Sequence, residues 1–268
     1  MSEASSRTSQ PVAPQSGAPH GRFDWPWRGG LAFVSPDGRQ LSLGGRAADD
    51  LDAAACATPW SGAFFALVNG SRRSFTVAEQ GAFDWHSRYT TIHDQVFRRP
   101  FRGGELTLGT RADPAEYRAA WRGHWFELHT RNAGPHPAAD TMLRTFDAFR
   151  FTETPLGMLL APRSTRQLRM EPVRVAKQIP GIGHLTIERP GTSQVAVPDF
   201  GGYRTAHGEM WRQPLGAGAQ GRARSDLLVL ATPTAVTRLM PGPAGVDTAD
   251  PNTAMAFLAG LNVTWEHP

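Results

Sequence analysis

The same pattern of apolar and polar residues occurs in two segments of this chain. Residues 140–155 read DTMLRTFDAFRFTETP, and residues 250–268 read DPNTAMAFLAGLNVTWEHP. When the two segments are aligned, four apolar residues of the first fall on four of the second: Leu143, Phe146, Phe149 and Phe151 on Met255, Leu258, Leu261 and Val263. An acidic start followed by apolar residues at helical spacing predicts a short amphipathic helix, and a strand follows it in each copy.

Elsewhere the hydrophobic pattern is mostly the short alternation typical of strands. Strands are predicted within 30–43, around the turn at Asn69-Gly70, at 105–109, 121–130, 173–187, 227–230 and 235–240, and a short helix within 46–57. This composition indicates an α+β protein of two similar, mostly antiparallel β modules, each closed by a helix and a strand. The predicted organisation is a disordered tail at 1–21, an N-terminal α+β module at 22–155 and a C-terminal α+β module at 156–268.

Charge and composition exclude several classes of protein. The chain has 28 Lys and Arg residues, of which Lys177 is the single lysine, and a formal net charge of +4. No basic stripe interleaved with aromatic residues is present, so we expect no nucleic-acid partner. Cys56 is the only cysteine, which rules out an intramolecular disulfide and a thiolate metal cage.

The sequence also bears on membrane and compartment. No apolar stretch approaches 18 residues, so we expect no membrane span. The first residues, MSEASSRTSQPVAPQSGAPHG, lack the charged and apolar regions of an export signal, which predicts a cytoplasmic protein.

Motifs of catalysis and cofactor binding are missing from the sequence. Histidines lie beside acidic residues at His86 and His93, with Asp94 adjacent, and around Glu127, without the spacing of a zinc site. There is no nucleophile elbow, phosphate-binding loop or dinucleotide fingerprint. We therefore predict no catalytic residue, metal or cofactor, and keep as an alternative a hydrolase or sugar-modifying enzyme that uses His86, His93 and Asp94.

Two aromatic-rich segments are candidates for contact with a protein partner, because Trp, Tyr and Arg dominate the energetics of protein interfaces. Within 81–101 they are Trp85, Tyr89 and Phe97, and within the loop-rich segment 191–224 they are Tyr203 and Trp211. Packing inside the fold is the competing interpretation for each of them.

Several short motifs follow one another in the second half. LGMLLAP begins at Leu156, Glu171 follows, and Ile179-Pro180-Gly181 leads into HLTI. HGEMW at 207–211, Val229-Leu230, AVTRLMPG and the closing LAGLNVTWEHP complete the series. In this order, over about residues 120–268, the chain resembles the lipase-immunity proteins of bacterial type VI secretion, and more loosely the small α+β modules of the photosystem-II-oxygen-evolving-P type.

The resemblance to the immunity family implies two similar α+β modules, no catalytic residues, and a protein that binds and blocks a cognate secreted antibacterial lipase. It also implies a periplasmic location, whereas the missing export signal favours the cytoplasm. A third hypothesis is a structural or assembly protein of a secretion or phage-like machine. The oligomeric state is left open.

Overall fold

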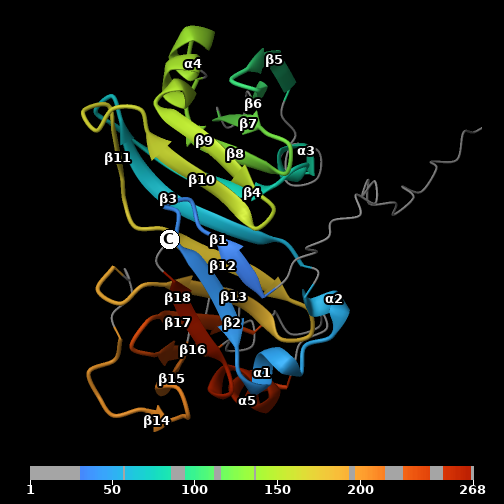
Figure 1. Ribbon diagram of the computed structural model, residues 1–268, viewed down its shortest axis with the longest axis vertical. Coiled ribbons are helices and arrows are strands. Elements are labelled where there is room, and N and C mark those ends of the chain that lie inside the picture. Colours follow the sequence, from blue (N-terminus) through green and yellow to red (C-terminus); the bar gives the residue numbers. More distant parts are fainter. Residues whose placement is uncertain are drawn as a thin grey trace, which may run out of the picture.

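The computed structural model describes eight stretches of the chain: residues 31–56, 58–85, 94–111, 116–135, 137–192, 197–214, 226–241 and 250–266. In these stretches the chain forms two β-sheets with few helices (Figure 1). Every pair of neighbouring strands is antiparallel except one, in which β1 and β10 run parallel. The predicted predominance of antiparallel strands is therefore confirmed.

In the described ranges the larger sheet has thirteen strands. The strands on the two sides of its centre follow one another in the same pattern of chain order. On one side the order is β3 (Trp60–Val68), β4 (Ser71–Glu79), β8 (Phe126–Ala133), β7 (Glu116–Arg122), β6 (Gly104–Arg111) and β5 (Asp94–Phe101). On the other side it is β12 (Arg174–Ile179), β13 (Gly183–Glu188), β17 (Val236–Met240), β16 (Asp226–Ala231), β15 (Glu209–Pro214) and β14 (Tyr203–Arg204). In each half a hairpin of two strands is followed in the sequence by four strands. The last of these four pairs with the second strand of the hairpin. The short β11 (Leu168–Met170) pairs with β3 beside this central junction.

The smaller sheet is made from both halves of the chain. Its order is β18 (Asn262–Glu266), β2 (Gln40–Gly44), β1 (Ala32–Val34), β10 (Gly157–Pro162) and β9 (Phe149–Thr154). The last strand of the first half, β9, pairs with β10, and the last strand of the second half, β18, pairs with β2. Each half thus ends in a strand that pairs with a strand of the other half.

Five helices accompany the sheets within the described ranges, and three of them are single turns. They are α1 (Arg46–Asp49), α2 (Ala53–Cys56), α3 (Ala82–Trp85), α4 (Ala139–Asp147) and α5 (Pro251–Ala259). Figure 1 shows α4 at one end of the molecule and α1 with α5 at the other. The two repeated segments of the sequence become α4 with β9 and α5 with β18, so both predicted helix–strand units are confirmed.

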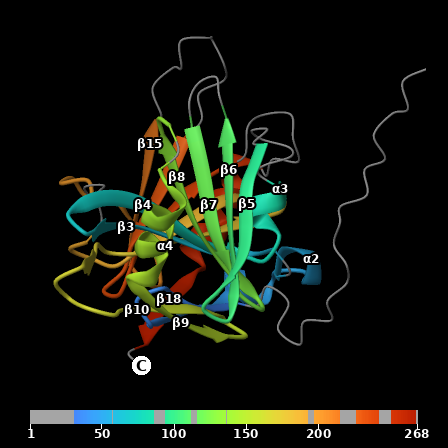
Figure 2. The same ribbon diagram turned by 90° about the horizontal axis from the view of Figure 1, so that it is seen from above.

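The hydrophobic core lies between the two sheets. Phe33 of β1 stacks on Trp60 of β3 with ring centroids 5.8 Å apart, which joins the sheets near their centre. In the first half Phe75 of β4 meets Phe146 and Phe149 edge to face, a favourable geometry for aromatic pairs. Most strands of the larger sheet point apolar side chains into this core, and we call the opposite side of the sheet the outer face. Figure 2, seen from the α4 end, shows β8, β7, β6 and β5 side by side in this sheet.

One sequence prediction was wrong because a side chain distant in sequence imposes a turn. Residues 121–130 were expected to be one strand, but β7 ends at Arg122 and β8 begins at Phe126. Glu153 of β9 accepts hydrogen bonds from the backbone amides of residues 124, 125 and 126 at 2.7–3.0 Å, which fixes the reversal. A β-carbon at Gly123 would lie 2.4 Å from this carboxylate, so a larger residue there would force the Glu153 side chain to move.

Other turns and strands were predicted with mixed success. Asn69 and Gly70 both have positive φ in the hairpin between β3 and β4, as the Asn-Gly pair indicates. The segment 191–224 was expected to be loop-rich, but it contributes β14 and β15 to the larger sheet. The predicted module boundary at 155 falls in the tight turn between β9 and β10.

Candidate functional site

Large apolar side chains are exposed together in one loop of the second half. In the described part of the chain the exposed large hydrophobic residues are Leu67, Val197, Phe200, Tyr203 and Met240. Three of these five lie within 197–203, and Phe200 and Tyr203 have the largest exposed fractions, 63% and 66%. Clustered exposed apolar side chains mark interaction surfaces, whereas single ones need no explanation.

The loop that carries these side chains is fixed from beneath by β15. Trp211 is only 6% exposed and packs on the outer face against Val229 and Val236. Its indole N–H donates a 2.7 Å hydrogen bond to the carbonyl oxygen of Phe200, so the ring positions the backbone that presents the Phe200 side chain. A β-carbon at Gly202 would lie 2.6 Å from the Met210 carbonyl oxygen, which explains why glycine precedes the exposed Tyr203.

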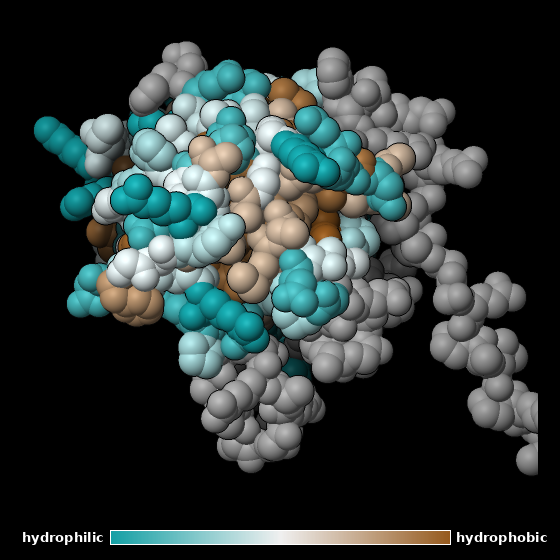
Figure 3. Space-filling view, turned by 90° about the horizontal axis from the view of Figure 1, so that it is seen from below, coloured by the Kyte–Doolittle hydropathy of each residue, from teal (hydrophilic) through white to brown (hydrophobic). Residues whose placement is uncertain are grey.

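A groove of about 750 Å³ begins at Tyr203 and runs along the end of the molecule formed by α1 and α5. Its apolar lining comes from both halves of the chain and from the turn between β12 and β13: Ala47, Leu51, Ile182, Ala256, Phe257 and Ala259. Figure 3 views this end and shows an apolar band between hydrophilic groups. The exposed Arg46 and Asp50 form a 3.8 Å ion pair at the edge of the groove, and the exposed Arg204 lies beside Tyr203.

A second, smaller cleft of about 320 Å³ lies where the two halves of the larger sheet meet. It is lined by residues of β3, β4 and β12 and of the segment before β12. Glu171 at its edge forms a two-point ion pair with Arg72, both contacts being 2.8 Å, and the Arg72 guanidinium lies 3.8 Å from the centre of the Phe65 ring. This cleft therefore lies between the two halves of the larger sheet.

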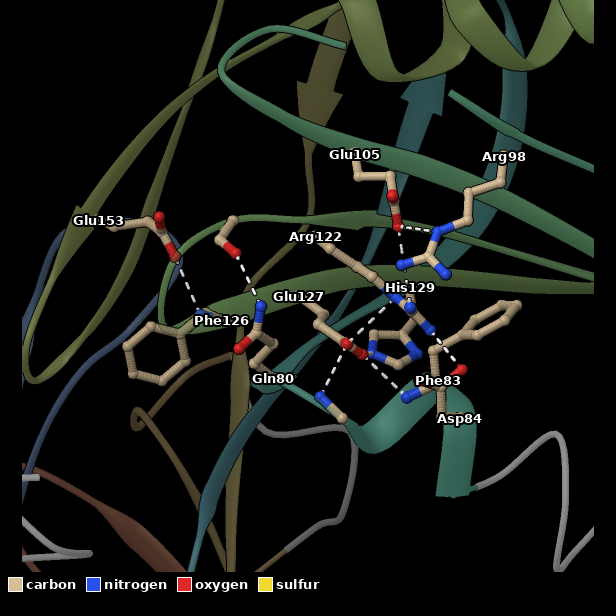
Figure 4. Close-up of polar contacts among 12 residues, drawn as sticks. Gln80, Phe83, Asp84, Arg98, Glu105, Arg122, Phe126, Glu127, His129 and Glu153 are labelled. Carbon is tan, nitrogen blue, oxygen red and sulfur yellow. Dashed lines mark hydrogen bonds and ion pairs between the residues drawn. The ribbon is translucent and has the colours of Figure 1, made fainter. Parts of the chain in front are cut away.

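The first half carries a buried ion network on its outer face (Figure 4). Glu127 of β8 is fully buried and accepts hydrogen bonds from the backbone amides of Gly81 at 2.7 Å and Phe83 at 2.8 Å. Its carboxylate also lies 2.9 Å from His129 Nε2 and 3.3 Å from Arg122 Nε, and Arg122 reaches Asp84 of α3 at 2.7 Å. Neither nitrogen meets the geometry of a hydrogen bond to Glu127, so both contacts are close approaches rather than hydrogen bonds.

The protonation state of Glu127 follows from these contacts. Burial raises the pKa of a carboxyl group, but His129, the Gly81 amide and Arg122 outweigh burial and hold the pKa of Glu127 below its usual value. Glu127 is therefore ionised at neutral pH, and its oxygens are occupied in holding α3 against the sheet. This arrangement fixes local structure, although its residue types resemble those of an acid–base site.

Lys177, the single lysine, connects the two halves inside the core. It lies on β12, is 1% exposed, and donates hydrogen bonds to the carbonyl oxygens of Cys56 at 3.1 Å and Thr58 at 2.5 Å. Its ammonium group lies 5.0 Å from the centre of the Trp60 ring, a cation–π distance. Burial lowers the pKa of Lys177 to about 8, although Cys56 and Glu79 act in the opposite direction.

The predicted partner-binding residues have different locations in the fold. Tyr203 is exposed at the groove, as a contact residue requires, whereas Trp211 is buried beneath the loop and can act there only by positioning Phe200. Phe97 of β5 is half-buried and packs against the core, which favours the packing interpretation for it. The side chain of Trp85 and the whole of Tyr89 lie outside the described residues.

The residues of the enzymatic alternative are not brought together within the described residues. His86 and His93 lie outside them, and Asp94 is exposed at the start of β5. Sequence reasoning missed Val197 and Phe200; the sequence VPDFGGY, an aromatic residue followed by two glycines in a loop, was the available signal. Sequence reasoning also missed that the Glu127 carboxylate accepts hydrogen bonds from backbone amides at the start of α3.

Comparisons with known proteins add no relative. No family model, no curated protein and no solved structure matches the chain. Within the described ranges, no helix has the length and apolar character needed to cross a bilayer. The same ranges hold no cluster of three or more histidine, cysteine or acidic side chains suited to a metal ion.

Proposed function

We propose that this chain is a non-enzymatic immunity protein that binds and blocks a cognate secreted antibacterial lipase, and that it acts in the compartment where the lipase arrives, the periplasm. The observation that carries a binding role is the exposed group of Val197, Phe200 and Tyr203 beside an apolar groove of about 750 Å³. Aromatic anchors beside a pre-formed apolar groove are the usual centre of a tight protein interface.

A lipase is a partner whose surface chemistry suits this groove. Such enzymes expose apolar surface around the active site in order to meet lipid, and an inhibitor must cover that surface. The groove supplies apolar side chains along its length, and Arg46 and Arg204 at its edge supply the type of charge that protein interfaces favour. Occlusion by these groups needs no reactive group on the inhibitor.

The two-module organisation that we propose is supported by the repeated strand order. Hairpin β3–β4 with β5–β8, α4 and β9 corresponds element by element to hairpin β12–β13 with β14–β17, α5 and β18. Phe146 and Leu258, which the sequence alignment pairs, are both completely buried. In this proposal the second module supplies Phe200, Tyr203 and most of the groove lining, and the first module contributes α1 and Leu51 to the same groove.

The experiment begins with affinity purification of the tagged full-length chain from its native cells. A retained protein is identified by mass spectrometry, purified, and assayed for ester hydrolysis with and without the chain. We expect a lipase whose activity falls to zero at one equivalent of the chain. A retained protein without esterase activity, or a lipase that the chain leaves active, would contradict the proposal. Recovery of the chain only with copies of itself would favour the assembly-protein alternative.

Matched substitutions test the surface. Phe200→Ser and Tyr203→Ala should each weaken binding of the lipase at least about tenfold, as loss of an interface anchor does. Leu67→Ser removes an exposed apolar side chain on β3, in the other half, and should leave affinity unchanged. Equal effects of all three would show that the 197–203 loop is not the contact surface.

A further inference from the structure

Arg118 on β7 is a buried cation without a hydrogen-bond partner for two of its nitrogens. It is only 7% exposed, and it points to the outer face of the first half. Its Nε and Nη1 atoms are buried, and neither finds a hydrogen-bond acceptor among the described residues. Burying such donors unsatisfied is costly, so native proteins rarely leave them so without a bound group.

Among the described residues, the side chains next to Arg118 leave a surplus of positive charge. Arg131 of β8 lies directly opposite it in the strand register, and Glu116 is engaged by Arg131 at 2.5 Å. On the other side the register residue is Gly109, which carries no side chain. Burial first, and then the charge of Arg131, lower the pKa of Arg118, while Glu116 acts against both.

The other arginines of this face show what Arg118 lacks. Arg98 pairs with Glu105 at 2.5 Å, and Arg122 pairs with Asp84 at 2.7 Å. Both are direct contacts between a guanidinium group and a carboxylate, and among the described residues no carboxylate makes such a contact with Arg118. Arg118 therefore lacks the carboxylate partner that Arg98 and Arg122 have, at least among the described residues, and an anion could take that place.

A second unsatisfied donor lies diagonally across the strand pair. Thr107 of β6 is 2% exposed, and its hydroxyl group also has no partner among the described residues. Thr107 faces Ala120, and Arg118 faces Gly109, so the two side chains share the outer face on neighbouring strands. Diagonal neighbours in a sheet are about 7–8 Å apart, within reach of one arginine side chain.

We propose that Arg118, Thr107 and Arg131 form a binding site for a small oxyanion, such as phosphate or a carboxylate. Guanidinium groups match the geometry of both ions, and a hydroxyl group can donate a further hydrogen bond. One bound anion would neutralise the surplus charge and satisfy the donors of Arg118 and Thr107. Arg131, whose side chain is 54% exposed, gives the site its solvent side. This site is built on β6, β7 and β8 and shares no residue with the groove between α1 and α5.

The test is thermal unfolding of the full chain in inorganic phosphate, in acetate, and in sodium chloride of equal ionic strength. A ligand that binds only the folded state raises the Tm, and we expect millimolar phosphate to raise it at least about 2 °C above the chloride reference. The acetate series shows whether a carboxylate can replace phosphate; a response to either ion supports the site. No response to phosphate or to acetate would overturn it.

Substitutions assign the response to the site. Arg118→Met should lose the response and have a higher Tm than the parent chain in chloride, because the uncompensated buried charge is gone. Should Arg118→Met not fold, Arg118→Lys keeps the charge without the planar fork and should respond less than half as strongly. Arg212→Met removes an exposed arginine that pairs with Asp226 in the other half, and should keep the full response. An unchanged response in both Arg118 variants would refute the site.

Discussion

The two halves of the larger sheet have the same strand order, but their outer faces are covered by different chemistry. In the first half α3 is held by the ionised Glu127 and its contacts with two backbone amides, His129 and Arg122. In the second half the 197–202 loop rests on Trp211, Val229 and Val236. The attachment of α3 to the sheet thus depends on charge, and that of the 197–202 loop depends on apolar packing. We call these two segments the covers of the outer face.

We propose that this difference separates a structural region from a binding region. A network of buried charges tolerates little movement, because each group left without its partner is costly. Apolar packing lies beneath the 197–202 loop of the second half. The opposite side of this segment is exposed, and Phe200 and Tyr203 face solvent there. We therefore expect substitutions in the first half to act on stability, and substitutions at the surface of the second to act on binding.

The largest effect should come from Glu127→Ala. This change leaves the Arg122 charge buried and two backbone amides without an acceptor, and should cost about 4 kcal/mol of unfolding free energy. Urea denaturation measures it. Glu105→Gln, at a partly exposed carboxylate of the same face, should cost less than about 1 kcal/mol. Equal losses would show that the network has no special role.

The charge of Glu127 also predicts a pH dependence. Because its pKa is lower in the folded chain, its contribution is complete above the unfolded value of 4.5 and is lost as the pH falls through the folded value. Hydrogen exchange below pH 4.5 should therefore rise at Gly81 and Phe83 before it rises at Phe200. The reverse order would break the comparison between the two covers.

Trp211→Ala should cost about 3 kcal/mol, the usual cost of removing a buried tryptophan. It should also abolish binding of the partner, because the Phe200 loop loses its support although no exposed residue has changed. Trp211→Phe keeps most of the packing and loses only the hydrogen bond to Phe200, so it should retain more of both properties. Binding is measured by calorimetry, and stability by urea denaturation. Full affinity in the alanine variant would contradict the positioning role.

Lys177 tests the contact between the halves. The folded chain releases its proton at about pH 8 and the unfolded chain at 10.5, so between these values the unfolded state binds more protons. The unfolding free energy of the parent chain should therefore rise relative to Lys177→Met by about 3 kcal/mol from pH 7.5 to 10.5. Urea denaturation of both chains across this range gives the difference. A constant difference would show that the ammonium group is not desolvated.

The smallest change in stability should come from Tyr203→Ala. Its side chain is 66% exposed, so the unfolding free energy should change by less than about 0.5 kcal/mol. Combined with a large loss of lipase binding, that result would separate the binding region from the structural one most clearly. A loss of several kcal/mol on urea denaturation would instead make Tyr203 a structural residue.

The sequence predicted those parts of the fold that depend on local pattern. The helix–strand units at 139–154 and 251–266 follow from apolar spacing, and the hairpin between β3 and β4 from Asn69-Gly70. The break between β7 and β8 could not be predicted, because it depends on Glu153, which is distant along the chain. β14 and β15 were missed because glycine-rich flanks hid two short strands.

The site was predictable only in part, for a similar reason. Tyr203 and Trp211 were both chosen by residue type, but their exposure depends on which face of a strand each occupies and on what covers that face. Residues 203 and 211 lie on the paired strands β14 and β15, yet one is 66% exposed and the other 6%. The groove draws on α1 and α5 from opposite ends of the sequence, so no local pattern reveals it.

Each half of the chain ends in a strand that pairs with a strand of the other half, and this arrangement has a consequence for synthesis of the protein. β2 comprises Gln40–Gly44, but its neighbour β18 comprises Asn262–Glu266, and most of the other strands lie between them in the sequence. During translation β2 therefore keeps one edge unpaired until β18 has left the ribosome. Non-local pairings of this kind slow folding, and an open strand edge invites aggregation. Nascent chains should thus need the protection of chaperones until the final strand is in place.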